Sequence, residues 1–124
     1  MSEYYHMTQD SNKLLIQLLF PEGILDYFDV SHIQQYEKEI SIYLEELNLI
    51  PEQYKNNKLL SKGFLPETRV QDFPVRGRAV YLFVKRRRWL NTDTGEIVTR
   101  NWDTVREGTR MTSEFASFLK AILG

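Results

Sequence analysis

Residues 79–89 constrain the fold more than any other segment, because side chains of two kinds alternate along them. Val80, Leu82 and Val84 fall on one side of an extended chain, and aromatic or charged residues fall on the other. This period of two is typical of a β-strand with one buried face. We therefore expect one strand over residues 79–89, ending in the four consecutive cations of residues 85–88.

Three other segments extend this strand into a small sheet. Residues 68–73 predict its partner strand, because the turn between them, residues 74–78, contains proline and glycine. Alternation over residues 27–36 and 40–47 predicts a second β-hairpin. Weaker expectations are a loop over residues 48–63 with a helical turn near 51–54, and a short strand over 96–100 after the turn Asp93-Thr94-Gly95.

Apolar residues at helical spacing predict a helix near each end of the chain. The first covers residues 11–20, behind Asp10 or Ser11 as N-cap, and ends at Pro21; residues 24–28 fit a helical turn or the start of a strand. The second follows Thr112 as N-cap. Its apolar face consists of Phe115, Phe118, Leu119 and Ile122. Both helices are expected to bury their apolar faces against the sheet.

The expected fold class is α+β, with antiparallel β-hairpins or a small sheet flanked by an N-terminal and a C-terminal helix. The 124 residues, 42% of them hydrophobic, suit a single domain over residues 1–124, with residues 1–10 flexible. There is no cysteine, so neither disulfides nor a zinc-thiolate site is available. We expect no metal and no cofactor. No apolar run approaches the ~20 residues of a membrane span, which favours a cytoplasmic protein without a membrane partner.

Charge is divided unevenly along the chain. Residues 1–66 carry 5 Lys and Arg against 10 Asp and Glu, and residues 67–124 carry 11 against 7. The halves are therefore −5 and +4. Such an asymmetry fits a basic surface that faces a polyanion, but charge alone favours an ordinary solvated surface.

The run at residues 85–88 is the strongest candidate site, because guanidinium groups match phosphate geometry. Tyr81 or Trp89 could stack on a base, or against an arginine, at its margin. The expected DNA-binding residues are Lys85, Arg86, Arg87, Arg88, Arg69, Arg76, Arg78 and Trp89. We expect alanine at Arg87 and Arg88 to leave the fold intact. The alternative is a strand end whose cations pair with Asp72, Asp93 and Glu96.

Catalytic constellations are weak. His6 and His32 are the only imidazoles, and the pairs Glu45 with Glu46 and Asp93 with Glu96 are typical of solvated faces and turns. The chain carries no complete active site, so we expect that it is not an enzyme.

Residues 69–89 resemble the N-terminal region of a large group of bacterial insertion-sequence transposases. That group has an Arg-x-x-Asp-Leu-Pro segment, a glycine turn, an alternating strand and an Arg-Arg-aromatic ending before a catalytic domain of the DDE type. Residues 109–112, with the helix after them, resemble the next segment of the group. Residues 21–28, 61–64 and 86–91 are similar to the ISAon-type branch, in which this region has its own reading frame. The resemblance covers about residues 12–123.

The resemblance implies a non-catalytic module that binds transposon-end DNA and assembles with a separately encoded catalytic transposase subunit. It leaves open whether the chain forms a homodimer. The wider group has cysteine pairs of a zinc-ribbon-like site, which would fall in residues 46–50 and 90–95 here and are absent. Two alternatives remain: a protein-interaction or regulatory subunit without DNA contact, and a metal-dependent nuclease that would need Asp72, Asp93 and Glu96 in one cleft.

Overall fold

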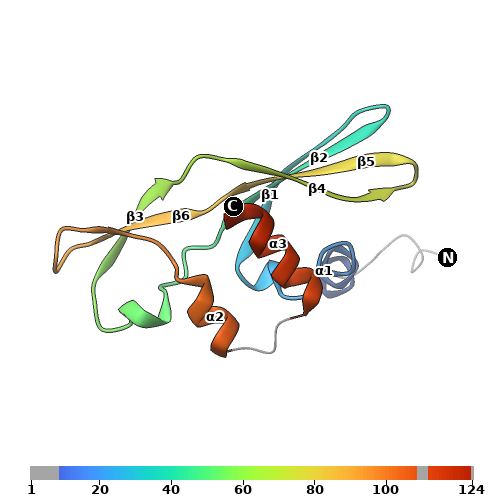
Figure 1. Cartoon of the computed structure of the whole chain (residues 1–124). Coiled ribbons are helices and arrows are strands. Elements are labelled where there is room, and N and C mark those ends of the chain that lie inside the picture. Colours follow the sequence, from blue (N-terminus) through green and yellow to red (C-terminus); the bar gives the residue numbers. More distant parts are fainter. Residues whose placement is uncertain (1–8, 109–111, 124) are drawn as a thin grey trace.

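The structure is a computed structural model that describes residues 9–108 and 112–123. Seven strands form two small sheets, and helices lie at both ends of the chain, which confirms the α+β class. The two sheets follow one another along the length of the molecule, and the helices lie together on one side of the strands (Figure 1).

Two hairpins build the larger sheet. The first joins β1 (Phe28–Gln35) to β2 (Glu39–Glu46), and the second joins β4 (Thr68–Val75) to β5 (Arg78–Lys85). Both were predicted and both are antiparallel. The strand order is β1-β2-β5-β4, so β2 and β5 meet in the centre, and this pair is parallel. Alternation within each strand carries no information about that junction, and the sequence did not predict it.

The parallel junction puts both hairpin turns at the same end of the sheet. The β4–β5 turn is made by Arg76 and Gly77, whose φ angles are 52° and 77°, between the paired residues Val75 and Arg78. Two successive positive φ angles are the geometry of the two-residue turn that matches the twist of antiparallel strands. Arg76 is the only residue other than glycine with positive φ in the described ranges.

The smaller sheet corrects the expectation of one continuous strand over residues 79–89. It consists of β3 (Leu59–Phe64), β6 (Arg87–Asn91) and β7 (Ile97–Val98), in the order β3-β6-β7. The predicted strand over 79–89 is wrong, since the chain leaves one sheet at Lys85 and enters the other at Arg87. Val84 and Trp89 are both buried, but Trp89 is the fifth residue after Val84, and an uninterrupted strand cannot place residues an odd number of steps apart on one face.

Two short 3₁₀ helices occupy segments that the sequence described only loosely. Residues 24–28 contain both expected elements, because η2 (Ile24–Asp26) precedes the first residue of β1. The expected turn near residues 51–54 is η3 (Glu52–Tyr54). The rest of the predicted loop was too long, since residues 59–63 belong to β3; the polar pattern of that exposed strand concealed it.

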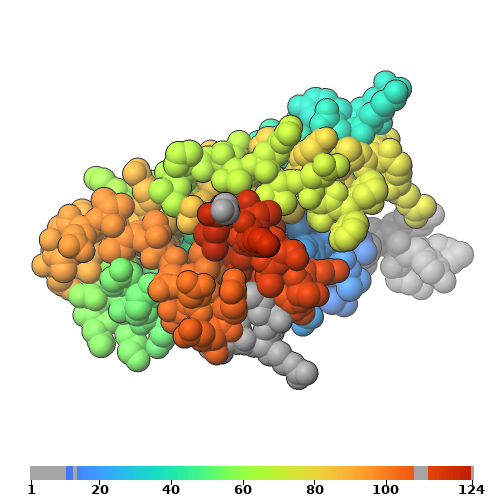
Figure 2. Space-filling model, in the orientation of Figure 1, coloured from blue at the N-terminus to red at the C-terminus, as the bar shows by residue number. Residues whose placement is uncertain are grey.

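Helix α3 (Ser113–Leu123) covers the inner face of the larger sheet as expected. The Thr112 hydroxyl accepts a hydrogen bond from the Phe115 N–H at 3.2 Å, which confirms the N-cap. In the space-filling view the red α3 lies against the yellow-green atoms of β4 (Figure 2). Gly23, at φ 95°, allows close packing, since a Cβ there would lie 2.6 Å from the Phe115 ring. The buried face of α3 is Phe115, Phe118, Leu119 and Ile122.

Helix α1 (Gln9–Leu18) confirms the predicted N-terminal helix but neither its N-cap nor its burial, since Asp10 and Ser11 lie within the helix. Leu14, Leu15 and Leu18 are 51–73% exposed, so this apolar face does not pack on the sheet. The expectation of flexibility for residues 1–10 falls mostly outside the described residues, and the last two of them belong to α1. Helix α2 (Trp102–Gly108) was missed; its first residue, Trp102, is only 4% exposed. None of the described helices combines the length and apolarity of a membrane span.

Candidate nucleic-acid interface

The structure divides the predicted DNA-binding residues into two groups along the β4–β5 hairpin. Arg76 and Arg78 lie at its turn. Lys85 and Arg86 lie at the opposite end of β5, where Arg69 is paired with Phe83 on the neighbouring strand. Arg88 follows on β6. From the rise of an extended chain, Arg78 and Lys85 are about 23 Å apart. The cations therefore form two ends of a ribbon and not one cluster.

The Arg87 side chain makes structural contacts between strands of the two sheets. Its Nε donates to the Glu46 main-chain carbonyl at 2.9 Å, and its Nη1 donates to the Ser61 hydroxyl. Its guanidinium lies 4.7 Å from the centroid of the Phe64 ring. These contacts tie β6 to β2 and β3. The prediction that alanine at Arg87 leaves the fold intact stays a prediction, although the substitution would remove these contacts. The Arg87 guanidinium already has hydrogen-bond partners within the described part of the chain, unlike the other cations of the predicted set.

Trp89 is also unsuited to the role that the sequence suggested. The side chain is 0% exposed, and its indole N–H donates to the Asn48 side-chain oxygen at 2.8 Å. A base cannot reach a ring that has no exposed face. Trp89 is a core residue whose polar atom is satisfied internally, as buried tryptophans usually are.

The remaining six cations are not used in internal ion pairs. The described residues form two such pairs, Arg100 with Glu46 and Lys55 with Glu52, and neither involves this set. The alternative, in which these cations pair with Asp72, Asp93 and Glu96, is not found among the ion pairs of the described residues. Buried Nε atoms of Arg78 and Arg88 have no hydrogen-bond partner among the described residues. The set consists of Arg69, Arg76, Arg78, Lys85, Arg86 and Arg88.

The outer face of the larger sheet carries an aromatic row beside these cations. His32, Tyr43, Phe83 and Arg69 are in register across the four strands. The Tyr43 and Phe83 rings are stacked with centroids 4.8 Å apart, and the Arg69 guanidinium lies 4.9 Å from the Tyr81 centroid. The described helices all lie on the other side of this sheet (Figure 1). The rings brace adjacent strands and hold Arg69 at an exposed position.

A buried ion pair stabilises the region where the chain passes from β5 of the larger sheet to β6 of the smaller one. The Arg100 Nε donates to Glu46 Oε2 at 2.8 Å, and the Arg87 main-chain N–H donates to Glu46 Oε1 at 3.1 Å. Arg100 also lies 5.2 Å from the Tyr27 ring centroid and 5.7 Å from that of Trp102. The interpretation of Glu46 as a solvated carboxylate is wrong, since it is 1% exposed.

The sequence did contain a signal for the burial of Glu46. With a period of two, Glu46 continues the face of Ile40, Ile42 and Leu44, which is the buried face of β2. A carboxylate on that face requires a cationic partner. Nothing in the local pattern pointed to Arg100, which is distant along the chain.

Burial raises the pKa of Glu46 above its ordinary value of 4.5, although the bonds from Arg100 and Arg87 and the charges of Arg100 and Arg86 oppose this shift. Because the folded-state pKa is raised, the group favours folding most fully below pH 4.5, and this contribution is lost as the pH rises through the folded-state pKa. We expect the difference in unfolding free energy between wild type and Glu46→Gln to fall as the pH rises from about 4 to about 8. Urea titrations of both proteins at several pH values measure this difference in unfolding free energy. A difference that rises with pH would contradict the expected sign.

The candidate catalytic groups do not converge. Asp72 lies on β4 of the larger sheet, whereas Asp93 and Glu96 lie between β6 and β7 of the smaller one. The Asp93 carboxylate accepts from the Asn57 side chain at 3.0 Å. His32 is exposed on β1, and His6 lies outside the described residues. In the described part of the chain, no three His, Asp or Glu side chains gather where they could hold a metal. This arrangement counts against the nuclease alternative.

Comparison with protein-family models, with curated proteins and with solved structures finds no match to this chain.

Proposed function

We propose that this chain is a non-catalytic DNA-binding and assembly module that acts with a separately encoded catalytic subunit in transposition. The single observation that carries the DNA contact is the set of six cations on and beside the β4–β5 hairpin that form no ion pair with any residue in the described part of the chain. Charges left unpaired in this way are available to neutralise phosphates. The transposition setting rests on the resemblance of residues 69–89 to the transposase group.

The separation of the two cation groups suits a duplex. The major groove is about 12 Å wide and admits a two-stranded ribbon, and one helical turn of DNA is about 34 Å long. Two groups of cations about 23 Å apart therefore suit phosphates at two separate positions along the DNA backbone. Phosphate contacts of this kind fix position and not sequence, so they support binding of many duplexes with similar affinity.

A second candidate function is a protein-interaction subunit without DNA contact. The observation that favours it is an apolar groove with a volume of about 720 Å³ on the inner face of the larger sheet. The two functions differ in one measurable property. Only the first requires an affinity for DNA that depends on the arginines of the hairpin.

A charge-removal variant tests the proposal. Arg69→Gln, Arg76→Asn and Arg86→Gln together remove three cations, and none of these side chains forms an ion pair within residues 9–108 and 112–123. Asparagine tolerates the positive φ of residue 76. We expect weaker binding to every duplex in mobility-shift titrations. The salt slope should become shallower by about one unit for each phosphate that is no longer neutralised, with terminal-repeat and scrambled DNA affected alike.

The matched control removes three exposed cations that lie on other elements than the hairpin and β6, by Lys58→Gln, Arg106→Gln and Lys120→Gln. The net charge of the two variants is the same, so a general charge effect would weaken both equally. Equal affinities for the variant and the control, with circular dichroism showing both folded, would remove the hairpin as the DNA contact and favour the protein-interaction function.

A further inference from the structure

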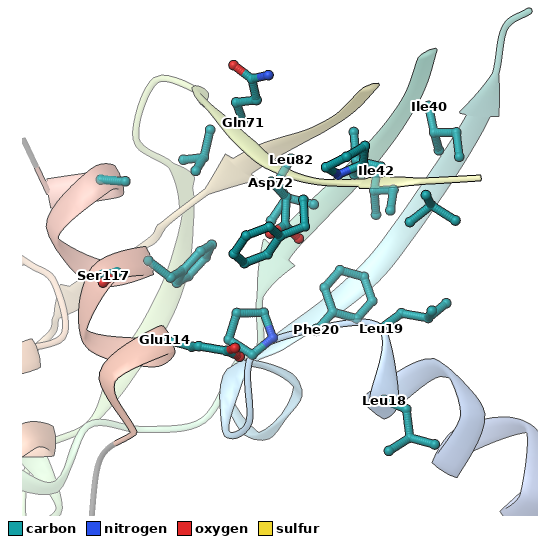
Figure 3. Close-up of a pocket in the computed structure, with 18 of the residues that line it drawn as sticks. Leu18, Leu19, Phe20, Ile40, Ile42, Gln71, Asp72, Leu82, Glu114 and Ser117 are labelled. Carbon is teal, nitrogen blue, oxygen red and sulfur yellow. The ribbon is translucent and has the colours of Figure 1, made fainter. Parts of the chain in front are cut away.

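The apolar groove lies between the inner face of the larger sheet and helix α3. Its floor includes Ile40, Ile42 and Leu82, and its wall on the α3 side includes Ser117 (Figure 3). Ile33 on β1 and Phe73 on β4 border it and are 56% and 77% exposed. The groove therefore crosses all four strands, and α3 fills only part of the apolar surface that the sheet offers.

Helix α1 leaves a second apolar surface without a partner. Leu14, Leu15 and Leu18 recur at helical spacing, and Ile16 and Leu19 extend the apolar surface to a second side. All five are 43–73% exposed. The chain thus exposes both an apolar helix and an apolar groove, a combination that single soluble domains seldom leave open to water.

The helix of the same chain is held out of its own groove. Helical turns continue beyond α1, because the Leu19 N–H bonds the Ile16 carbonyl at 3.0 Å and the Phe20 N–H bonds the Gln17 carbonyl at 3.3 Å. Phe20 is 8% exposed and anchored in the core. Because these bonds continue the helical turn as far as the buried Phe20, the position of Phe20 sets the direction in which α1 leaves the core. Only its last turn reaches the groove, where Leu18 and Leu19 line one end (Figure 3).

We propose that the groove binds helix α1 of a second copy of this chain, and that two copies exchange these helices in a symmetric dimer. Both surfaces belong to every copy, so two copies can exchange their helices reciprocally, and a two-fold arrangement of this kind closes at two chains. The dimensions agree: a helix of 10 residues is about 15 Å long, and four strands span about 15 Å. The dimer does not depend on the proposed DNA contact, because the groove contains none of the exposed arginines.

Disulfide cross-linking tests which chain occupies the groove. The protein has no native cysteine, so only the introduced cysteines can form a disulfide. One chain carries Leu15→Cys on α1 and a second carries Ser117→Cys in the groove, so a disulfide between them can form only between copies. We expect the mixture to give a covalent dimer on a non-reducing gel. The control mixture pairs Leu15→Cys with Lys62→Cys, at an exposed position on β3 outside the groove. Equal cross-linking in both mixtures, or none with Ser117→Cys, would overturn the proposal.

Sedimentation of the full chain gives an independent result. Wild type should sediment as a dimer of 14.8 kDa chains at micromolar concentration, and Leu15→Glu should raise the dissociation constant at least tenfold. Leu60→Glu is the matched control, because Leu60 on β3 is 50% exposed and Leu15 is 51% exposed. A wild-type monomer at every concentration, or the same effect from both substitutions, would show that α1 and the groove do not form this interface.

Discussion

Arg100→Met should lower the free energy of unfolding by about 3–5 kcal/mol at neutral pH. The substitution leaves Glu46 buried at 1% exposure without the side chain that donates to it at 2.8 Å. It also removes the donor to the Leu49 carbonyl and the cation beside the Tyr27 ring. The cost arises from an uncompensated buried carboxylate, and urea unfolding followed by tryptophan fluorescence measures it.

Two controls separate the ion pair from a general effect of losing an arginine. Arg106→Met changes an exposed arginine of α2 and should shift the unfolding free energy by no more than about 0.5 kcal/mol. Adding Glu46→Leu to Arg100→Met should recover much of the lost stability, because an apolar pair leaves no buried charge. A double variant as unstable as the sum of the two single variants would show that the ion pair is not the cause.

Phe118→Ala should destabilise the fold by about 3–5 kcal/mol, the usual cost of removing a buried aromatic ring. Phe118 is 5% exposed. Its ring meets Phe28 and Phe115 edge to face, with centroid distances of 5.8 Å and 6.4 Å. The substitution therefore removes the contact by which α3 is packed on β1.

Leu123→Ala is the matched control for this substitution, because Leu123 lies on the same helix and is 42% exposed. It should cost less than about 1 kcal/mol. Both values come from the midpoint and slope of chemical denaturation. A destabilisation below about 1 kcal/mol for Phe118→Ala would mean that α3 contributes little to the core and that its packing on the sheet is dispensable.

Local patterns predicted the elements whose burial is local. The period-two faces of β2 and β5 and the i, i+3, i+4, i+7 face of α3 are confirmed, because each reports which side of one element is buried. Helix α1 has an equally clear apolar face, yet that face is exposed in the single chain. Apolar residues at helical spacing predict that a helix has an apolar face. They do not indicate whether the surface that covers this face belongs to the same chain.

The missed features depend on contacts between distant segments. The strand is interrupted at Arg86, and this break allows Val84 and Trp89 both to be buried. The break could not be predicted from the sequence, because it depends on how the two sheets are placed in space. Arg87 and Arg86 look equivalent in the sequence, but one bonds Glu46 and Ser61 and the other makes no ion pair. The basic run therefore indicated where cations lie along the chain, whereas the role of each arginine depends on its partners in space.

The most direct test of the proposed function is the salt dependence of duplex binding by the full wild-type chain. Association constants are measured by fluorescence anisotropy at several salt concentrations, with terminal-repeat and scrambled duplexes. If at least three of the six unpaired cations contact phosphates, the logarithm of the constant should fall with the logarithm of salt with a slope of about −3 or steeper, for both duplexes. Absence of binding at low salt, or a slope near zero, would contradict the proposed DNA contact.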